Sequence, residues 1–194
     1  MRRTPILATV ALALVLAGCS SPAAPEAEQT EMSSPSATAT TTTPTAAGDV
    51  QQGDGYSYTA PEGWGIPEGQ EKPAGVDTIA ADLEDTDGFA DNVNVVLSPS
   101  GEVTTEQVET LGVQELEGGG ATGVEVLDRV EIAGVESSHL TALLSSEGTE
   151  YRIEQYYPTN AGQTYVVTFT FNDTVDEADR DALAQSVLAT WEWA

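Results

Sequence analysis

The stretch between Gly123 and Phe171 constrains the fold of this chain more than any other part of its sequence. Three β-type runs follow one another there, GVEVLDRVEIAG, GVESSHLTALLSSEG and TEYRIEQYYP, and the run QTYVVTFTF comes next. β-Branched and aromatic residues, which favour strands, recur in these runs. Short Gly-containing turns, at Ala133-Gly134 and at Glu147-Gly148, separate the runs. Such turns join consecutive strands into β-hairpins, so we expect neighbouring strands to be antiparallel.

Shorter segments upstream predict further strands and one weak helix. The strand patterns are GYSYTAPEGW, VDTIAADLE and NVNVVLS, and the helical pattern is TTEQVETLGVQELEGG. The helix would place Val108, Leu111 and Glu115 on one side and end at the glycines 118–120. In the long run that follows, valines are interspersed with acids, Val124 and Val126 against Glu125 and Asp128, a pattern typical of a strand.

The end of the chain, TVDEADRDALAQSVLATWEW, predicts an amphipathic helix. Thr174 and Glu177 have the spacing of a capping box, and Leu183, Val187 and Trp191 recur every four residues. The fold class we predict is therefore α+β, an antiparallel β-sheet packed with helices and closed by one C-terminal amphipathic helix.

The amino terminus has the pattern of an export signal. Arg2 and Arg3 precede the apolar run Ile6 to Leu16, which is too short for a membrane span of about 20 residues. The run ends in Leu-Ala-Gly-Cys at positions 16–19, which resembles the lipobox of bacterial lipoproteins. The resemblance implies a diacylglyceryl group on the Cys19 sulfur, with palmitate-type acyl chains. It also implies cleavage before Cys19, which becomes the mature amino terminus, and a location on the extracytoplasmic face of the cell membrane.

Composition excludes several classes of function. The chain has 32 acidic and 6 basic residues, two of which, Arg2 and Arg3, would leave with the signal. Nucleic acids and anionic lipid headgroups bind Lys and Arg patches, so neither is an expected partner. Cys19 is the only cysteine and His139 the only histidine, so a disulfide, a Cys-ligated metal site and a zinc or copper site are not expected.

Composition also divides the chain into three parts. Residues 1–18 are the predicted signal peptide, and residues 19–52 are a Ser-, Thr-, Ala- and Pro-rich tether that we expect to be disordered. The tether is either a bare linker or a carrier of O-linked sugar. Residues 53–194 have strand and helix patterns throughout and form the predicted globular domain.

Three parts of this domain resemble PsbP-like domains. They are the opening GYSYTAPEGW, the middle GFADNVNVVLSPSG before a helix, and the final third from GVESSHLTALL to LAQSVLATW. Together with the lipobox and tether, the chain is most similar to the LpqN-type lipoproteins of actinobacteria. The resemblance implies an α/β/α sandwich and a non-enzymatic, protein-binding role. It supplies no binding residue that can be carried over.

Two groups of side chains are candidate binding sites. Aromatic residues dominate protein contact surfaces, so a surface could be formed by Tyr56, Tyr58, Trp64, Tyr156 and Tyr157, unless these pack in the core. Asp82, Asp85 and Asp87 in DLEDTDG are weak candidates for an irregular oxygen-ligated cation site, but a solvated turn explains them as well. No cofactor is expected.

Catalysis has weaker support. His139 lacks the G-x-S-x-G context of a serine hydrolase and has the position of a strand-surface residue. Alternatively, an envelope hydrolase could pair two of the glutamates at 131, 136, 150 and 154, or a cation-dependent protein could use the acidic residues. A lipid or small-molecule carrier would need an apolar cavity. We favour a lipid-anchored, non-catalytic module that binds an unidentified envelope protein, with these classes as alternatives.

Overall fold

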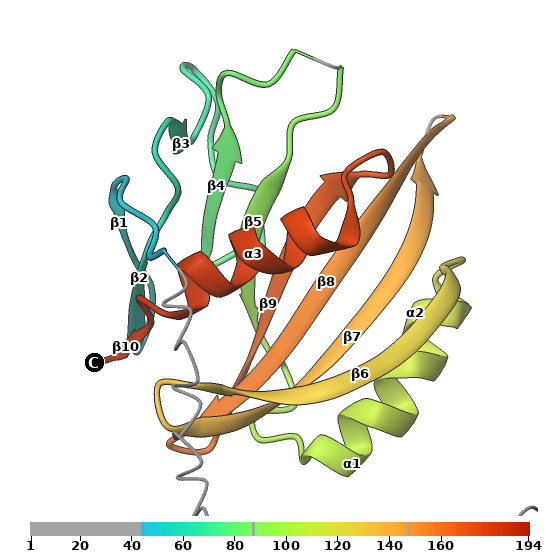
Figure 1. Cartoon of the computed structure of the whole chain (residues 1–194). Coiled ribbons are helices and arrows are strands. Elements are labelled where there is room, and N and C mark those ends of the chain that lie inside the picture. Colours follow the sequence, from blue (N-terminus) through green and yellow to red (C-terminus); the bar gives the residue numbers. More distant parts are fainter. Residues whose placement is uncertain (1–43, 87, 147) are drawn as a thin grey trace, which may run out of the picture. The chain divides into compact units, whose positions relative to one another are not determined.

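The computed structural model describes residues 44–86, 88–146 and 148–194. Within them, seven strands form one sheet in the order β3-β4-β5-β9-β8-β7-β6, and three form a small sheet in the order β1-β2-β10 (Figure 1). The elements in chain order are β1 (Val50–Gln52), β2 (Tyr56–Thr59), β3 (Trp64–Gly65), β4 (Thr78–Asp82), β5 (Asn92–Leu97), α1 (Thr105–Gln107), the π-helical turn η1 (Val108–Gly112), α2 (Val113–Gly118), β6 (Thr122–Ile132), β7 (Val135–Ser146), β8 (Thr149–Asn160), β9 (Gln163–Asn172), α3 (Glu177–Leu188) and β10 (Glu192–Trp193).

The antiparallel sheet that the sequence predicts is confirmed, and it dominates the molecule. Every pair of adjacent strands is antiparallel among the residues described. The structure contains less helix than the α/β/α sandwich that the resemblance implies. α3 crosses one face of the large sheet, and the short α1–η1–α2 segment packs beside β6 and β7 (Figure 1).

Two tight turns set the register of the long hairpins. Ala133-Gly134 joins β6 to β7, and Ala161-Gly162 joins β8 to β9. Both residues of each turn have positive φ, at 47° and 82° in the first and 50° and 83° in the second. Two consecutive positive φ values are characteristic of the type I′ turn, whose twist matches that of the strands it connects.

Strand β6 departs from the regular alternation of faces along a strand. Its pairing with β7 shifts between Thr122 and Glu125 and again between Leu127 and Val130, which marks irregularities of the β-bulge type. Each bulge adds a residue and inverts the faces of the residues that follow. Val126, an apolar residue of this pattern, is 45% exposed.

The main hydrophobic core lies between the large sheet and α3. Its centre is formed by inward-facing residues of β5 and β9, such as Val93, Val95, Val167 and Phe169, all fully buried. Ala184 and Val187 of α3 complete this core from the helical side. A smaller cluster of Ala121, Ala142 and Ile153 lies on the opposite face.

An aromatic cluster joins the small sheet to the large one. The ring of Tyr56 on β2 stacks on Trp191, with centroids 4.5 Å apart, and meets Tyr165 of β9 edge-on. Trp191 follows α3 and was expected to be its last apolar position. It lies instead in the turn before β10, where it packs between the two sheets.

Two further boundaries differ from the sequence predictions. β1 pairs with β2, so ordered pairing begins at Val50, inside the predicted tether of residues 19–52. The predicted capping box of α3 is wrong, because Thr174 donates its hydroxyl hydrogen to Asn172 Oδ1 and the N-cap residue is Asp176.

The predicted helix at 104–119 is interrupted by η1, and its expected apolar residue Leu111 is 57% exposed.

The predicted signal peptide, the lipidation site Cys19 and most of the tether lie outside the described residues. Among the residues that are described, no helix has the length and apolar character needed to cross a membrane.

Candidate functional site

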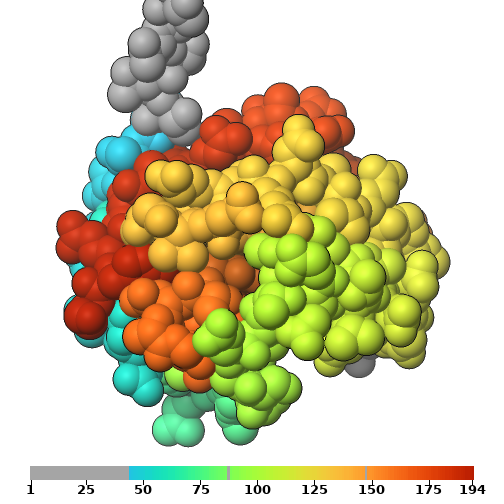
Figure 2. All heavy atoms as spheres, turned by 90° about the horizontal axis from the view of Figure 1, so that it is seen from below, coloured from blue at the N-terminus to red at the C-terminus, as the bar shows by residue number. Residues whose placement is uncertain are grey.

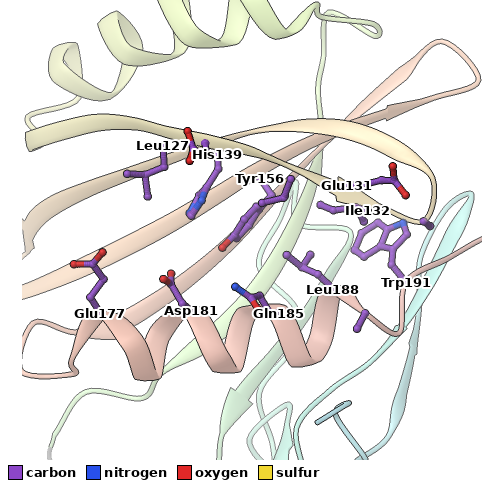
Figure 3. Close-up of a pocket in the computed structure, with 14 residues that line it drawn as sticks. Leu127, Glu131, Ile132, His139, Tyr156, Glu177, Asp181, Gln185, Leu188 and Trp191 are labelled. Atoms are coloured by element: carbon purple, nitrogen blue, oxygen red, sulfur yellow. The ribbon is translucent and has the colours of Figure 1, made fainter. Parts of the chain in front are cut away.

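An open groove of about 550 Å³ lies between β6 and α3. β7 and β8 contribute His139 and Tyr156 to its floor (Figure 3). The residues that line it are Leu127, Asp128, Val130, Glu131, Ile132, Ala133, His139, Tyr156, Glu177, Asp181, Gln185, Leu188, Ala189 and Trp191. Figure 3 shows residues from β6 on one side and Glu177, Asp181 and Gln185 along α3 on the other.

The floor of the groove is a stacked pair of rings. His139 on β7 and Tyr156 on β8 are directly opposite each other in the strand register. Their ring centroids are 4.2 Å apart, and both residues are buried. Burial, and secondarily the carboxylates of Glu154 and Asp181, raise the pKa of the Tyr156 phenol, so it stays protonated at neutral pH.

A buried ionic network lies behind this floor. Glu154, only 1% exposed, accepts a hydrogen bond from Arg180 Nε at 2.9 Å and one from the Thr141 hydroxyl at 3.1 Å. Its second oxygen is 3.0 Å from His139 Nε2. Burial raises the pKa of Glu154, but hydrogen bonds from His139 and Arg180 outweigh it and hold the pKa below its ordinary value. Glu154 is therefore ionised at neutral pH, and its charge is matched by Arg180.

The rim of the groove is acidic on both sides. Glu177 and Asp181 are one helical turn apart on α3, and Asp128 and Glu131 are on β6. Burial, and then repulsion from Glu154, raise the pKa of Asp181. The charged form of Asp181 is therefore disfavoured first by burial and then by the neighbouring negative charge. Among the described residues that line the groove there is no Lys or Arg.

The one basic residue of β6 is engaged away from the groove. Arg129 makes two hydrogen bonds to Glu109, at 2.6 and 2.9 Å, and one to Glu136 at 2.8 Å. Glu109 belongs to η1, so these contacts hold the α1–η1–α2 segment against the β6–β7 hairpin. Arg129 is not among the groove residues, and its charge does not neutralise the rim.

This arrangement is suited to binding a cationic group. Apolar side chains of Leu127, Val130 and Ile132 cover one wall, and the carboxylates surround them.

A nucleophilic mechanism at His139 would need a hydroxyl group held by the histidine. Within the described part of the chain, Glu154 is the only side chain that shares a hydrogen bond with His139. The expectation that His139 lies at the strand surface is wrong, because the residue is 6% exposed.

Four of the five aromatic residues predicted as a contact surface are core residues. Tyr56, Tyr58, Tyr156 and Trp64 are at most 6% exposed, because β2, β3 and β8 turn these side chains inward. Tyr156 alone among them borders the groove. Tyr157 is half-buried and donates its hydroxyl hydrogen to Gln155 Oε1 at 2.7 Å. It follows Tyr156 in β8 and therefore points to the opposite face of the sheet.

Asp82 and Asp85, two of the three predicted cation ligands, both accept hydrogen bonds from the backbone. Asp82 Oδ1 accepts from the backbone of Glu84 at 2.9 Å, as in a local turn, and Asp85 accepts a 3.5 Å hydrogen bond from the backbone of Asp91. Asp87 lies outside the described residues. Among the described residues, no three His, Cys, Asp or Glu side chains are grouped so that they could hold a metal ion.

Of the four glutamates considered for hydrolysis, only Glu131 is among the described residues that line the groove. Glu131 and Glu136 face each other across β6 and β7, while Glu150 is exposed near the start of β8. Glu154 is buried against Arg180 and His139. Glu131 and Glu136 are neighbours, but Glu136 pairs with Arg129 and is not among the groove residues. The groove carboxylates on α3 were not anticipated, because Glu177 was considered only for a capping box and Asp181 was not singled out.

No protein-family model and no curated protein matches the sequence of this chain, whereas several solved structures are similar to its structure. Similar solved structures include PsbP (CyanoP) of Synechocystis, with 19% identity and a TM-score of 0.48 over 75% of this chain and 92% of that one. LpqN of Mycobacterium tuberculosis, described as involved in cell envelope biogenesis, has 19% identity and a TM-score of 0.49 over 77% and 88%. The yeast Ran-binding protein Mog1p, from Saccharomyces cerevisiae, has 15% identity and a TM-score of 0.48 over 72% and 90%.

Proposed function

We propose that this chain is a lipid-anchored, non-catalytic binding module of the bacterial cell envelope. In this proposal Cys19 carries the lipid, and the groove between β6 and α3 binds a positively charged segment of a partner protein. The lipobox-like Leu-Ala-Gly-Cys at positions 16–19 supports the anchor, and the acid-rimmed groove supports the binding role.

The observation that carries the binding role is the unbalanced charge of the groove. Carboxylates stand on both of its walls, and no basic side chain lines it among the described residues. Burial, and then repulsion from Glu154, raise the pKa of Asp181, so both disfavour its charged form. A Lys or Arg side chain entering the groove would relieve the repulsion, and the stem of that side chain would cover the apolar wall.

A fluorescent peptide with several lysines tests the binding role at about 0.15 M salt, where the Debye length is about 8 Å. In the double variant Glu177→Gln/Asp181→Asn, we expect the Kd to rise about tenfold, which corresponds to roughly 1.4 kcal/mol. The matched control is Glu68→Gln/Glu71→Gln, which removes two charges from an exposed loop. It should change the Kd less than about twofold, since exposed charges are screened. Equal effects of the two double variants would mean that net charge, and not the groove, attracts the peptide.

The anchor is tested in intact cells by labelling with an alkyne analogue of palmitate. The full-length chain should take up the label and sediment with membranes, whereas Cys19→Ser should take up none and appear in the medium. A single acyl chain gives only reversible membrane binding, so stable sedimentation would indicate at least two. Labelling of Cys19→Ser at the same level would contradict the assignment of this residue.

A further inference from the structure

We infer that the partner segment binds as an extended strand along the free edge of β6, with alternate basic side chains directed toward α3. This inference rests on the proposed function and specifies the conformation and side-chain pattern of the partner.

Strand β6 is the outermost strand of the large sheet on this side. It has 11 residues, and in the described part of the chain it pairs only with β7. In Figure 2 the yellow residues of β6 lie at the surface between the green α1–α2 region and the red C-terminal segment. An edge strand has backbone N–H and C=O groups that point away from the sheet, and an added strand can pair with them.

The edge of β6, as well as one face, borders the groove. A strand that turned only one face to a groove would contribute every second residue. Here the lining includes Leu127 and Asp128, and then the uninterrupted run 130–133. The shift in pairing between Leu127 and Val130 coincides with this segment. A bulge increases the local bend of a strand, which explains how the backbone edge comes to face α3.

The charges on β6 disfavour pairing of this strand with a second copy of the chain and favour pairing with a basic segment. Glu125, Asp128 and Glu131 are exposed along the strand, and Arg129 is neutralised by Glu109 and Glu136. Two copies paired edge to edge would bring these carboxylates together, and the charges would repel each other. Natural edge strands commonly use such charges to prevent pairing with another copy. A segment with lysine or arginine at alternate positions would meet opposite charges along the whole edge.

The two walls have matching lengths. From Leu127 to Ile132 a strand advances about 17 Å at ~3.4 Å per residue. From Glu177 to Leu188 a helix also advances about 17 Å at ~1.5 Å per residue. The groove therefore holds five or six extended residues. Alternate side chains of a strand are about 6.8 Å apart. This is close to the rise of about 6 Å between Glu177 and Asp181, which are four residues apart at ~1.5 Å per residue.

The far end of the groove is suited to an apolar residue. Ile132, Leu188 and Trp191 meet there, as Figure 3 shows, and all three are buried. The indole Nε1 of Trp191 is buried without a hydrogen-bond acceptor among the described residues. An extended segment has a carbonyl group at every residue and would offer such an acceptor close to this end. The partner pattern is thus two basic residues at alternate positions and an apolar residue two positions beyond them.

Backbone N-methylation tests this inference. The parent is a peptide with lysines at alternate positions, threonines between them and a terminal valine. Two derivatives carry N-methyl groups, one on the lysine amides and the other on the threonine amides, so they match in charge and in number of methyl groups. Because amides alternate between the two edges of a strand, only one derivative loses its hydrogen bonds to β6. We expect a loss of affinity above tenfold for that derivative and below threefold for the other.

The outcomes separate this inference from the proposed function. If the parent peptide binds the double variant Glu177→Gln/Asp181→Asn as tightly as it binds the wild-type chain, the proposed function fails. If binding depends on those carboxylates but the two N-methylated peptides bind alike, the function stands and strand pairing is wrong.

Hydrogen exchange with the unmodified chain gives a second, independent readout. Peptide binding should slow exchange of amides in residues 125–132 and leave α1–η1–α2 unchanged. Protection confined to α3 would overturn the inference in favour of a segment that docks on the helix. Protection of β6 that rises with protein concentration, with no peptide present, would overturn it in favour of a second copy.

Discussion

Glu154 is a charged residue in the interior of this protein, and its neighbours explain why. Arg180 and His139 lie within hydrogen-bonding distance of its two oxygens, at 2.9 and 3.0 Å. Paired buried charges often contribute little net stability, because their desolvation offsets their attraction. Removing one partner is costly, however, since the other charge is then left buried without compensation.

We predict that Glu154→Gln lowers the free energy of unfolding by about 3–5 kcal/mol at pH 7, because Arg180 loses its counter-charge. Urea denaturation measures this. The matched control is Glu150→Gln in the same strand, whose exposed side chain should matter by less than about 0.5 kcal/mol. Equal effects of the two changes would show that the ionic network is not needed for stability.

The same residue predicts how stability depends on pH. The pKa of Glu154 is lower in the folded than in the unfolded chain, whose value is about 4.3. Its contribution to stability is therefore complete above that unfolded value and is lost as pH falls through the folded value. The difference in unfolding free energy between the wild type and Glu154→Gln should shrink below about pH 4. A difference that stays constant from pH 7 to pH 3 would contradict this assignment.

The partners of Glu154 could not be read from the sequence. Alternation along β7 and β8 puts His139, Thr141 and Glu154 on one face of the sheet, which is a local property. It does not reveal that Arg180, 26 residues further on, reaches that face from α3. In a chain with 32 acids, a glutamate in a strand is expected at the surface, and only the packed helix makes this one internal.

At the scale of elements, the hairpins were predictable because their signals are local. The turn at Ala133-Gly134 and the strands on both sides of it follow from residues that are adjacent in sequence. The bulges in β6 were not, because they depend on how β6 packs on β7 and around α3. The N-cap of α3 was also misplaced, since Thr174 bonds to Asn172 and does not cap the helix.

The β8–β9 turn offers a stabilising change. Ala161 has a φ of 50°, a left-handed conformation that costs alanine about 1 kcal/mol or more. Asparagine adopts it more readily, and Asn-Gly is the preferred type I′ pair. We predict that Ala161→Asn raises the free energy of unfolding by about 0.5–1 kcal/mol in thermal or urea denaturation.

The control for this change is its neighbour. Gly162 has a φ of 83°, so Gly162→Ala should destabilise by about 1 kcal/mol through the same steric effect. If Ala161→Asn were neutral while Gly162→Ala destabilised, only the second turn position would be strained.

At the scale of the whole molecule, Trp191 connects parts of the chain that are distant in sequence. Its ring stacks on Tyr56 and Tyr58 of the small sheet and meets Tyr165 of the large sheet edge-on. It also closes one end of the groove. The small sheet consists of strands of two to four residues, so we expect its stability to depend on this packing.

We predict that Trp191→Ala lowers the free energy of unfolding by about 3–5 kcal/mol, as is typical for a buried tryptophan. Hydrogen exchange should rise in β1, β2 and β10 more than in β7 and β8. The control is Trp193→Ala, whose half-buried ring donates one hydrogen bond to Ala133 O and should cost about 1 kcal/mol. Uniform acceleration of exchange in both sheets would contradict a specific connecting role.

The sequence by itself determined the antiparallel hairpins, the strong acidity and the absence of any cysteine after position 19, because each depends only on composition or on neighbouring residues. The tertiary structure decided which acids are internal and which surround a groove. Glu154 is internal because Arg180 of α3 lies against it, and Glu177 and Asp181 form a rim because β6 lies opposite α3. Such juxtapositions join segments that are distant in sequence, 26 residues apart for Glu154 and Arg180 and about 50 for β6 and α3, and no local pattern encodes them.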